Sequence, residues 1–254
     1  MKKITLLAFA LIAFVGLQAQ LFNIGGFGVG YLYVGPKVGG NISTMSTEVT
    51  GTIDKKMNLG YQFGAVAKFG ITKKLSIQPE LIFSEKGVAA KDDALNFKAK
   101  SNYKYFGLPI IAQYAFKTIA GIQIYGSGGF YTDVLTGQTY VTKSDNGDTF
   151  SESHDDLSIY NRVDFGFNIG GGANIPFKNK DQLNIDLRFA QGVVNIDDYN
   201  TTSSSKNTSI QLSAIYLMDL TKFVNFKGKS ILEEDAYEES TAPAGDSKVE
   251  PEEN

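Results

Sequence analysis

The chain has 254 residues, a formal net charge of −3 from 24 basic and 27 acidic side chains, and no cysteine. The lack of cysteine excludes disulfides, cysteine metal sites and an amino-terminal lipid on cysteine, and the lack of a long basic stripe in the sequence argues against nucleic-acid binding. With 27 Gly, 18 Phe and 13 Tyr but 6 Pro, the composition favours strands over helices.

The first segment has the pattern of a secretory signal peptide. Two lysines at positions 2 and 3 precede an apolar run over 4–17, and Ala19 is a small residue before a plausible cleavage point. A retained transmembrane anchor is the alternative, but the run is shorter than the roughly 20 residues that a spanning helix needs. We therefore expect residues 1–19 to be removed after export.

Eight segments alternate apolar and polar side chains, which is typical of strands with two different faces. The second shows the pattern clearly, because Leu59, Tyr61 and Phe63 alternate with Gly60 and Gln62. The expected strands lie at 29–43, 58–71, 75–89, 102–116, 121–142, 159–176, 182–194 and 208–219.

The connections between these strands are alternately short and long. Tight turns are expected at 72–74, 117–120 and 177–181, and longer polar loops at 44–57, 90–101, 143–158 and 195–207. This alternation is typical of an outer-membrane barrel with extracellular loops and periplasmic turns. The sequence thus predicts an all-β, antiparallel, up-and-down transmembrane barrel of eight strands, with both termini periplasmic. A soluble periplasmic barrel or sandwich, with its apolar face inward, is the alternative.

The apolar faces are expected to meet lipid, and the polar faces to fill a narrow lumen. Both signs of charge occur on the polar faces of strands distant in sequence, so they can pair across the interior. Unpaired buried charges are costly, which predicts a structural network of salt bridges and no diffusive passage of ordinary solutes. The predicted lumen network consists of Lys37, Lys68, Glu80, Lys86, Arg162, Asp164, Asp186 and Arg188.

No catalytic, cofactor or metal site is predicted. The run Ser151–Asp156 combines hydroxyl, imidazole and carboxylate groups around His154, the single histidine, but neighbours on one loop seldom have catalytic geometry. The run Asp145–Asp148 lacks the closing Glu of a calcium loop. The pair Asp197–Asp198 is likewise not predicted to be a calcium site. The run Gly170–Gly172 lies within a strand and is expected to allow curvature or packing of bulky lumen side chains.

Three stretches resemble the PorT-like outer-membrane β-barrel family. Gly35 to Ser43 resembles its first-strand signature, Leu75 to Gly87 contains the Gln-Pro-Glu-Leu strand, and Tyr103 to Tyr114 resembles a later strand. The resemblance covers roughly residues 30–220 and implies an outer-membrane barrel related in form to OmpA-type barrels. Some members of that family are tied to protein secretion and surface assembly.

The expected organisation is a signal peptide at 1–19, a barrel at 20–220, and an acidic, disordered periplasmic tail at 221–254, where charge is high and apolar content low. We expect a non-enzymatic protein of the Gram-negative-type outer membrane that acts as a scaffold or interaction surface. Its expected partners are the lipid bilayer and a periplasmic or surface protein. The alternatives are an accessory of protein secretion and a narrow ligand-binding or transport barrel.

Overall fold

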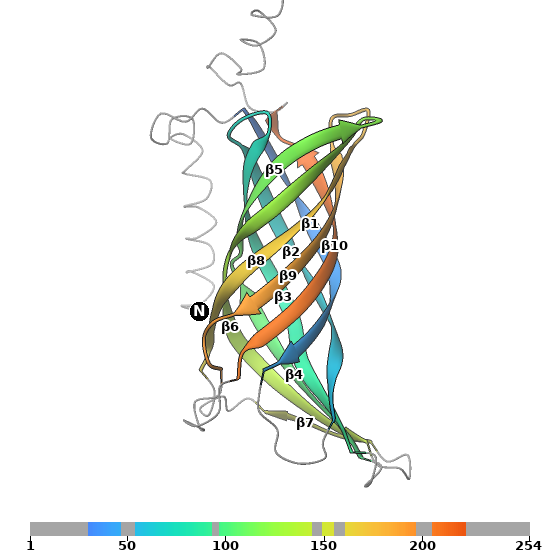
Figure 1. Cartoon of the computed structure of the whole chain (residues 1–254), viewed down its shortest axis with the longest axis vertical. Coiled ribbons are helices and arrows are strands. Elements are labelled where there is room, and N and C mark those ends of the chain that lie inside the picture. Colours follow the sequence, from blue (N-terminus) through green and yellow to red (C-terminus); the bar gives the residue numbers. More distant parts are fainter. Residues whose placement is uncertain are drawn as a thin grey trace, which may run out of the picture.

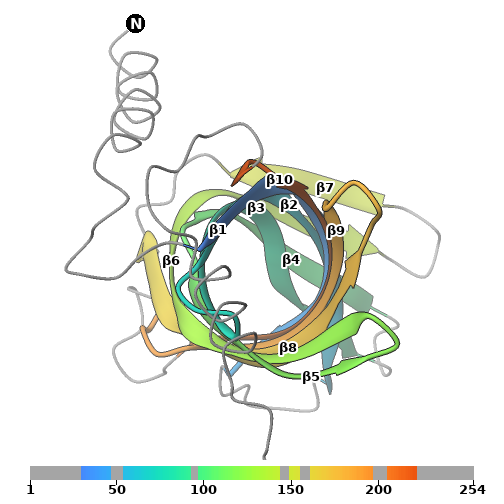
Figure 2. The same ribbon diagram turned by 90° about the horizontal axis from the view of Figure 1, so that it is seen from above.

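The computed structural model describes residues 30–46, 54–92, 97–143, 149–154, 161–196 and 205–221. Within these ranges all strands belong to one antiparallel sheet that closes on itself (Figures 1 and 2). No helix within the described ranges is both long enough and apolar enough to cross a bilayer. The strands are β1 (Tyr31–Met45), β2 (Asp54–Gly70), β3 (Leu75–Asp92), β4 (Phe97–Gly107), β5 (Ile110–Ile119), β6 (Ile122–Lys143), β7 (Thr149–His154), β8 (Val163–Pro176), β9 (Gln182–Gly192) and β10 (Asn207–Asp219).

The ring has eight members because β4 and β5 share one position in it and β7 and β8, which both pair with β6, share another. β1 pairs with both β2 and β10, which closes the sheet, while β3 and β6 each pair with β4 and β5. The predicted fourth strand therefore occupies one position in the ring, between β3 and β6, and is interrupted at Leu108 and Pro109. Pro109 has no N–H to donate, yet its carbonyl accepts from Glu80 N at 2.8 Å, and Leu108 N donates to Thr132 O at 2.9 Å. The predicted eight-stranded antiparallel barrel is confirmed.

Tight connections gather at one end of the barrel, which we call the turn end. Ala120 and Gly121 join β5 to β6 with φ of 50° and 82°, the left-handed pair of a type I′ hairpin turn. The strand β5 thus ends at Ile119, three residues beyond the predicted strand end at 116 and within the turn predicted at 117–120. Segments 71–74 and 177–181 make the other two turns, and β1 begins and β10 ends at this same end (Figure 1).

The opposite end, here the loop end, contains more strand than predicted. β3 and β4 remain paired as far as Asp92 and Phe97, and β6 and β7 as far as Lys143 and Thr149. These pairings occupy parts of segments that were expected to be loops. They extend one side of the barrel wall well past the other (Figure 1). A bulge at Thr136, opposite the Lys104–Tyr105 step, gives the long strand β6 its irregularity.

The two faces of the sheet have opposite chemistry. Leu59 on the outer face is 72% exposed and Phe116 is 64% exposed, whereas Lys37 on the inner face is 2% exposed. The outward apolar side chains that the alternation predicted form the outside of the ring. A closed sheet with this outer surface is suited to lipid, because closure leaves no open sheet edge.

Candidate functional site

Four charged side chains form a compact group in the lumen, which we call the Glu80 cluster: Lys37, Glu80, Asp186 and Arg188. Lys37 Nζ lies 2.8 Å from Glu80 Oε2, and Arg188 Nη2 lies 2.8 Å from Glu80 Oε1. Arg188 also donates to Asp186, two residues before it on the same face of β9. Two cations thus balance two carboxylates, and Gln78 Nε2 adds a hydrogen bond of 2.8 Å to Glu80.

A second group, the Lys86 cluster, consists of Lys86, Asp133, Asp164, Tyr105 and Tyr131. Lys86 Nζ lies 2.6 Å from Asp133 Oδ2 and 3.8 Å from Asp164 Oδ2. It also lies 5.1 Å and 4.6 Å from the ring centres of Tyr105 and Tyr131, within the range of cation–π attraction. One cation here serves two carboxylates, which are direct partners in the β6–β8 ladder.

Neutral donors complete the Lys86 cluster. Asn207 Nδ2 donates to Asp164 Oδ2 at 2.8 Å and lies 3.1 Å from Tyr105 Oη, while Tyr131 Oη donates to Asp164 at 3.4 Å. Hydrogen bonds to the charged form of a carboxylate lower the cost of burying it.

Lys68 is a third kind of buried cation. Its Nζ donates to Asn174 Oδ1 at 3.3 Å and lies 5.6 Å from the centre of the Tyr125 ring. Within the described part of the chain it makes no ion pair with a carboxylate. Together, the two clusters and Lys68 contain four cations and four carboxylates, so this group of buried charges is formally neutral.

Glycines on the inner face make room for the large lumen side chains. A Cβ at Gly172 would lie 2.5 Å from Tyr125 Oη, and one at Gly166 would lie 2.6 Å from the Tyr131 ring. Such contacts are far below van der Waals distance. The glycine run at 170–172 therefore serves to pack bulky lumen neighbours, one of the two roles expected for it.

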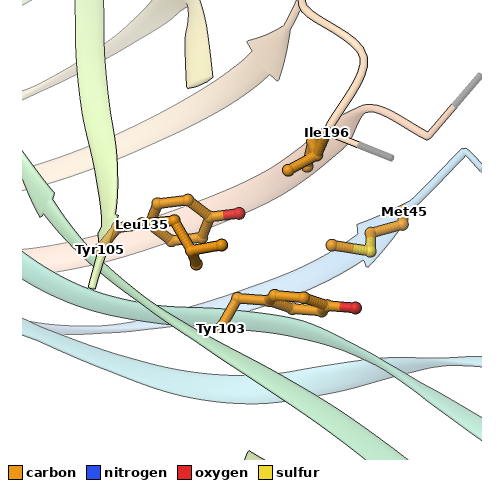
Figure 3. Close-up of a cluster of buried hydrophobic side chains, with 5 residues drawn as sticks. All are labelled: Met45, Tyr103, Tyr105, Leu135 and Ile196. Atoms are coloured by element: carbon orange, nitrogen blue, oxygen red, sulfur yellow. The ribbon is translucent and has the colours of Figure 1, made fainter. Parts of the chain in front are cut away.

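Apolar side chains pack inside the lumen on both sides of the Glu80 cluster. The loop-end cluster consists of Met45, Tyr103, Tyr105, Leu135 and Ile196, which converge in Figure 3. The turn-end cluster consists of Val66, Ile215 and Leu217, with Tyr33 packed against it. Along β1 the order is Tyr33, Lys37 and Met45, so the Glu80 cluster lies between the two apolar clusters.

The space left inside is small. A cavity of about 20 Å³ lies between the two charged clusters, lined by Glu80 and Arg188 on one side and by Lys86 and Asp133 on the other. A cavity needs about 10–15 Å³ to hold one water molecule. This cavity therefore has room for about one water molecule. No group of three or more His, Cys, Asp or Glu side chains suited to a metal occurs within the described ranges.

The prediction was wrong for Arg162. It lies just before β8 and is exposed, because that strand begins only at Val163. The other seven residues of the predicted network are buried inside the barrel. Their role as a structural network stays a prediction.

Sequence reasoning missed Asp133 and the tyrosines that fill the lumen, namely Tyr105, Tyr125 and Tyr131. Tyr125, Tyr131 and Asp133 share one parity along β6 and are all buried, so the alternation within that segment is the signal that could have found them.

Several candidate motifs fall partly or wholly outside the described residues. Ser151 to His154 belong to β7, where His154 is the register partner of Gln138, and not to a loop as predicted. Positions 145–148, 155–156 and 197–198 lie outside the described residues. So do the predicted signal peptide and all of the predicted tail except Thr221.

Comparisons with known proteins found one matching family and several similar solved structures. The family described as outer membrane protein β-barrel domain matches residues 18–198. No curated protein sequence matches the chain. Among solved structures, Neisserial surface protein A is 10% identical with a TM-score of 0.43, covering 73% of this chain and 96% of that one. OprG from Pseudomonas aeruginosa is 12% identical with a TM-score of 0.44, covering 74% and 95%. Ail of Yersinia pestis, solved with the heparin analogue sucrose octasulfate, is 14% identical with a TM-score of 0.38, covering 74% and 99%.

Proposed function

The chain belongs to the family of outer membrane protein β-barrel domains, and we propose that it works there as a non-enzymatic scaffold whose interaction surface is its loop end. As a member of that family it is an outer-membrane protein embedded in the lipid bilayer. The remaining question is which part of the barrel acts on something other than lipid.

The filled lumen is the observation that carries the proposal. Among the described residues, charged and apolar side chains occupy the interior, and the cavity between the two charged clusters measures about 20 Å³. A transport or ligand-binding barrel needs an open interior, so the lumen supports neither role. The outer apolar face contacts lipid. Function is thereby assigned to the two ends of the barrel, and the purified protein is expected to conduct no ions across a planar bilayer.

We further infer the orientation. An export signal at 1–19 delivers the chain to the periplasm, and β1 begins and β10 ends at the turn end. This supports a periplasmic turn end and an extracellular loop end. In this arrangement the acidic segment 221–254 is periplasmic and is available to a basic partner. Because the chain resembles the PorT-like family, we retain an accessory role in secretion as a second form of the proposal.

Site-specific photo-crosslinking in intact cells tests the scaffold role. A photoreactive residue replaces Phe150, which is 63% exposed on β7 at the loop end, or, as the matched control, Leu212, which is 57% exposed on the outer face of β10. Specific protein adducts are expected at 150 and none at 212. Equal adducts at both positions, or none at 150, would contradict the proposal.

Deletion of the gene, followed by profiling of surface proteins, tests the secretion form separately. Loss of particular surface proteins from the deleted strain supports an accessory role in export. An unchanged surface profile removes that form of the proposal and leaves the scaffold role to the crosslinking result.

A further inference from the structure

The outward face of β4 and β5 changes abruptly from apolar to basic near the loop end. The ladder between β3 and β4 has no register shift, so alternate residues of β4 stay on one face. Toward the turn end this face holds Phe106, Leu108, Ile110, Ala112, Tyr114 and Phe116. Toward the loop end it holds Lys98, Lys100, Asn102 and Lys104.

The neighbouring strand β6 adds a fourth lysine to this face. Lys143 is the direct register partner of Lys98, and paired residues of an antiparallel ladder point to the same side. We call Lys98, Lys100, Lys104 and Lys143 the lysine stripe. Three of its members are exposed and Lys104 is half-buried. The stripe is continuous with the apolar band that meets lipid.

Among the described residues around the stripe, positive charges outnumber negative ones. Like charges directly opposite each other destabilise a sheet, yet Lys98 stands opposite Lys143 in the β4–β6 ladder. No ion pair joins the stripe to a carboxylate among the described residues. Glu85, the register partner of Lys104, is the acid on the neighbouring strand. A bound anion would relieve this repulsion.

The height of the stripe selects the kind of anion. A strand residue advances about 3.3 Å, or about 2.5 Å along the membrane normal at a tilt of about 40°. Phe106 to Phe116 then span about 25 Å, the expected height of the apolar band. On the same scale Lys104 stands about 5 Å beyond the band, Lys100 about 15 Å and Lys98 about 20 Å.

A simple phospholipid does not reach that far. The polar layer of a phospholipid leaflet is about 5–7 Å thick, so Lys104 alone stands at the level of its phosphates. We propose that the lysine stripe binds a glycolipid of the leaflet at the loop end, one whose anionic groups are carried on an extended, phosphorylated headgroup. The site goes beyond the scaffold role and rests only on the embedding of the barrel in a bilayer.

The test compares two variants of equal charge change in the purified full-length protein. The stripe variant carries Lys98→Gln, Lys100→Gln and Lys143→Gln. The control carries Lys74→Gln, Lys117→Gln and Lys178→Gln, three exposed lysines at the turn end. Binding is titrated in detergent micelles with lipopolysaccharide that bears its phosphorylated core, with lipid A that lacks the core, with phosphatidylglycerol and with a soluble acidic peptide.

We expect the wild type to bind the core-bearing glycolipid most tightly. A basic residue near an anionic surface contributes about fivefold in affinity, so the stripe variant should lose at least about tenfold for this ligand and the control less than about twofold. Because the substituted side chains are exposed, both variants should keep the electrophoretic shift between unheated and boiled samples that marks a folded barrel.

Three results would overturn the proposal. Equal losses in both variants would show a general effect of net charge, and equal affinity for phosphatidylglycerol would show that headgroup height is irrelevant. Binding of a soluble acidic peptide with the affinity of the glycolipid would assign the stripe to a protein partner. None of these results bears on the crosslinking at position 150, so the two proposals can fail independently.

Discussion

The Glu80 cluster and the Lys86 cluster lie in the same lumen but solve the burial of charge differently. The first holds two cations and two carboxylates, each in direct contact with an opposite charge. The second holds one cation between two carboxylates and relies on Asn207 and on tyrosine rings for the rest. The difference indicates that the first group is neutral as a unit, whereas the second depends on a single side chain.

The largest effect is expected for Lys86→Met. It leaves Asp133 and Asp164 as buried register partners with no cation between them. Removing one partner of a buried ion pair costs about 3–5 kcal/mol, and two stranded carboxylates place this variant at the upper end. Urea unfolding from lipid vesicles measures the free energy. Adding Asp133→Asn and Asp164→Asn should restore most of the lost free energy of unfolding. A loss below about 1 kcal/mol in the single variant would show that the cluster does not depend on Lys86.

A smaller effect is expected for Glu80→Gln in the balanced cluster. The amide keeps the shape and one acceptor for Lys37, and Arg188 keeps its contact with Asp186. The expected cost is about 3 kcal/mol, the lower end of the range for a broken buried pair. The same vesicle unfolding assay measures it. A cost equal to or above that of Lys86→Met would abolish the contrast between the two clusters.

The smallest effect is expected for Lys68→Met. This lysine has a hydrogen bond to Asn174 and the Tyr125 ring but no described carboxylate partner, so its removal strands no charge. Replacing a buried charge with an apolar side chain of similar size is often neutral, and we expect a change of less than about 1 kcal/mol. A loss of several kcal/mol would mean that Lys68 balances the Lys86 cluster through the length of the lumen.

The ring and its two faces could be predicted from the sequence because alternation has a period of two and each strand reports it locally. The outward run through Leu59, Tyr61 and Phe63 shows this directly, as all three are exposed. The inward position of Lys37, Glu80 and Arg188 followed from the same rule. Alternation could not say whether the apolar face met lipid or a core.

The pairing of charges could not be predicted, because it depends on register between strands far apart in the chain. Lys86 reaches Asp133 across 47 positions, and Lys37 reaches Glu80 across 43. A shift of one residue in either strand would turn these side chains to the other face. The prediction for Arg162 was wrong for a related reason. The strand starts one residue after it, and the alternation does not extend past a strand end.

The extended side of the barrel wall should resist proteolysis at the cell surface. Lys98, Lys100, Lys104 and Lys143 project from paired strands whose backbone is held on both sides by the β3–β4–β6–β7 ladders. A protease must draw an unpaired, extended segment into its own active site, and a laddered wall does not offer one. Trypsin added to intact cells should therefore spare these lysines although solvent reaches them, whereas amine-reactive reagents should modify them. Resistance to digestion in this region reports backbone pairing, not shelter by the membrane.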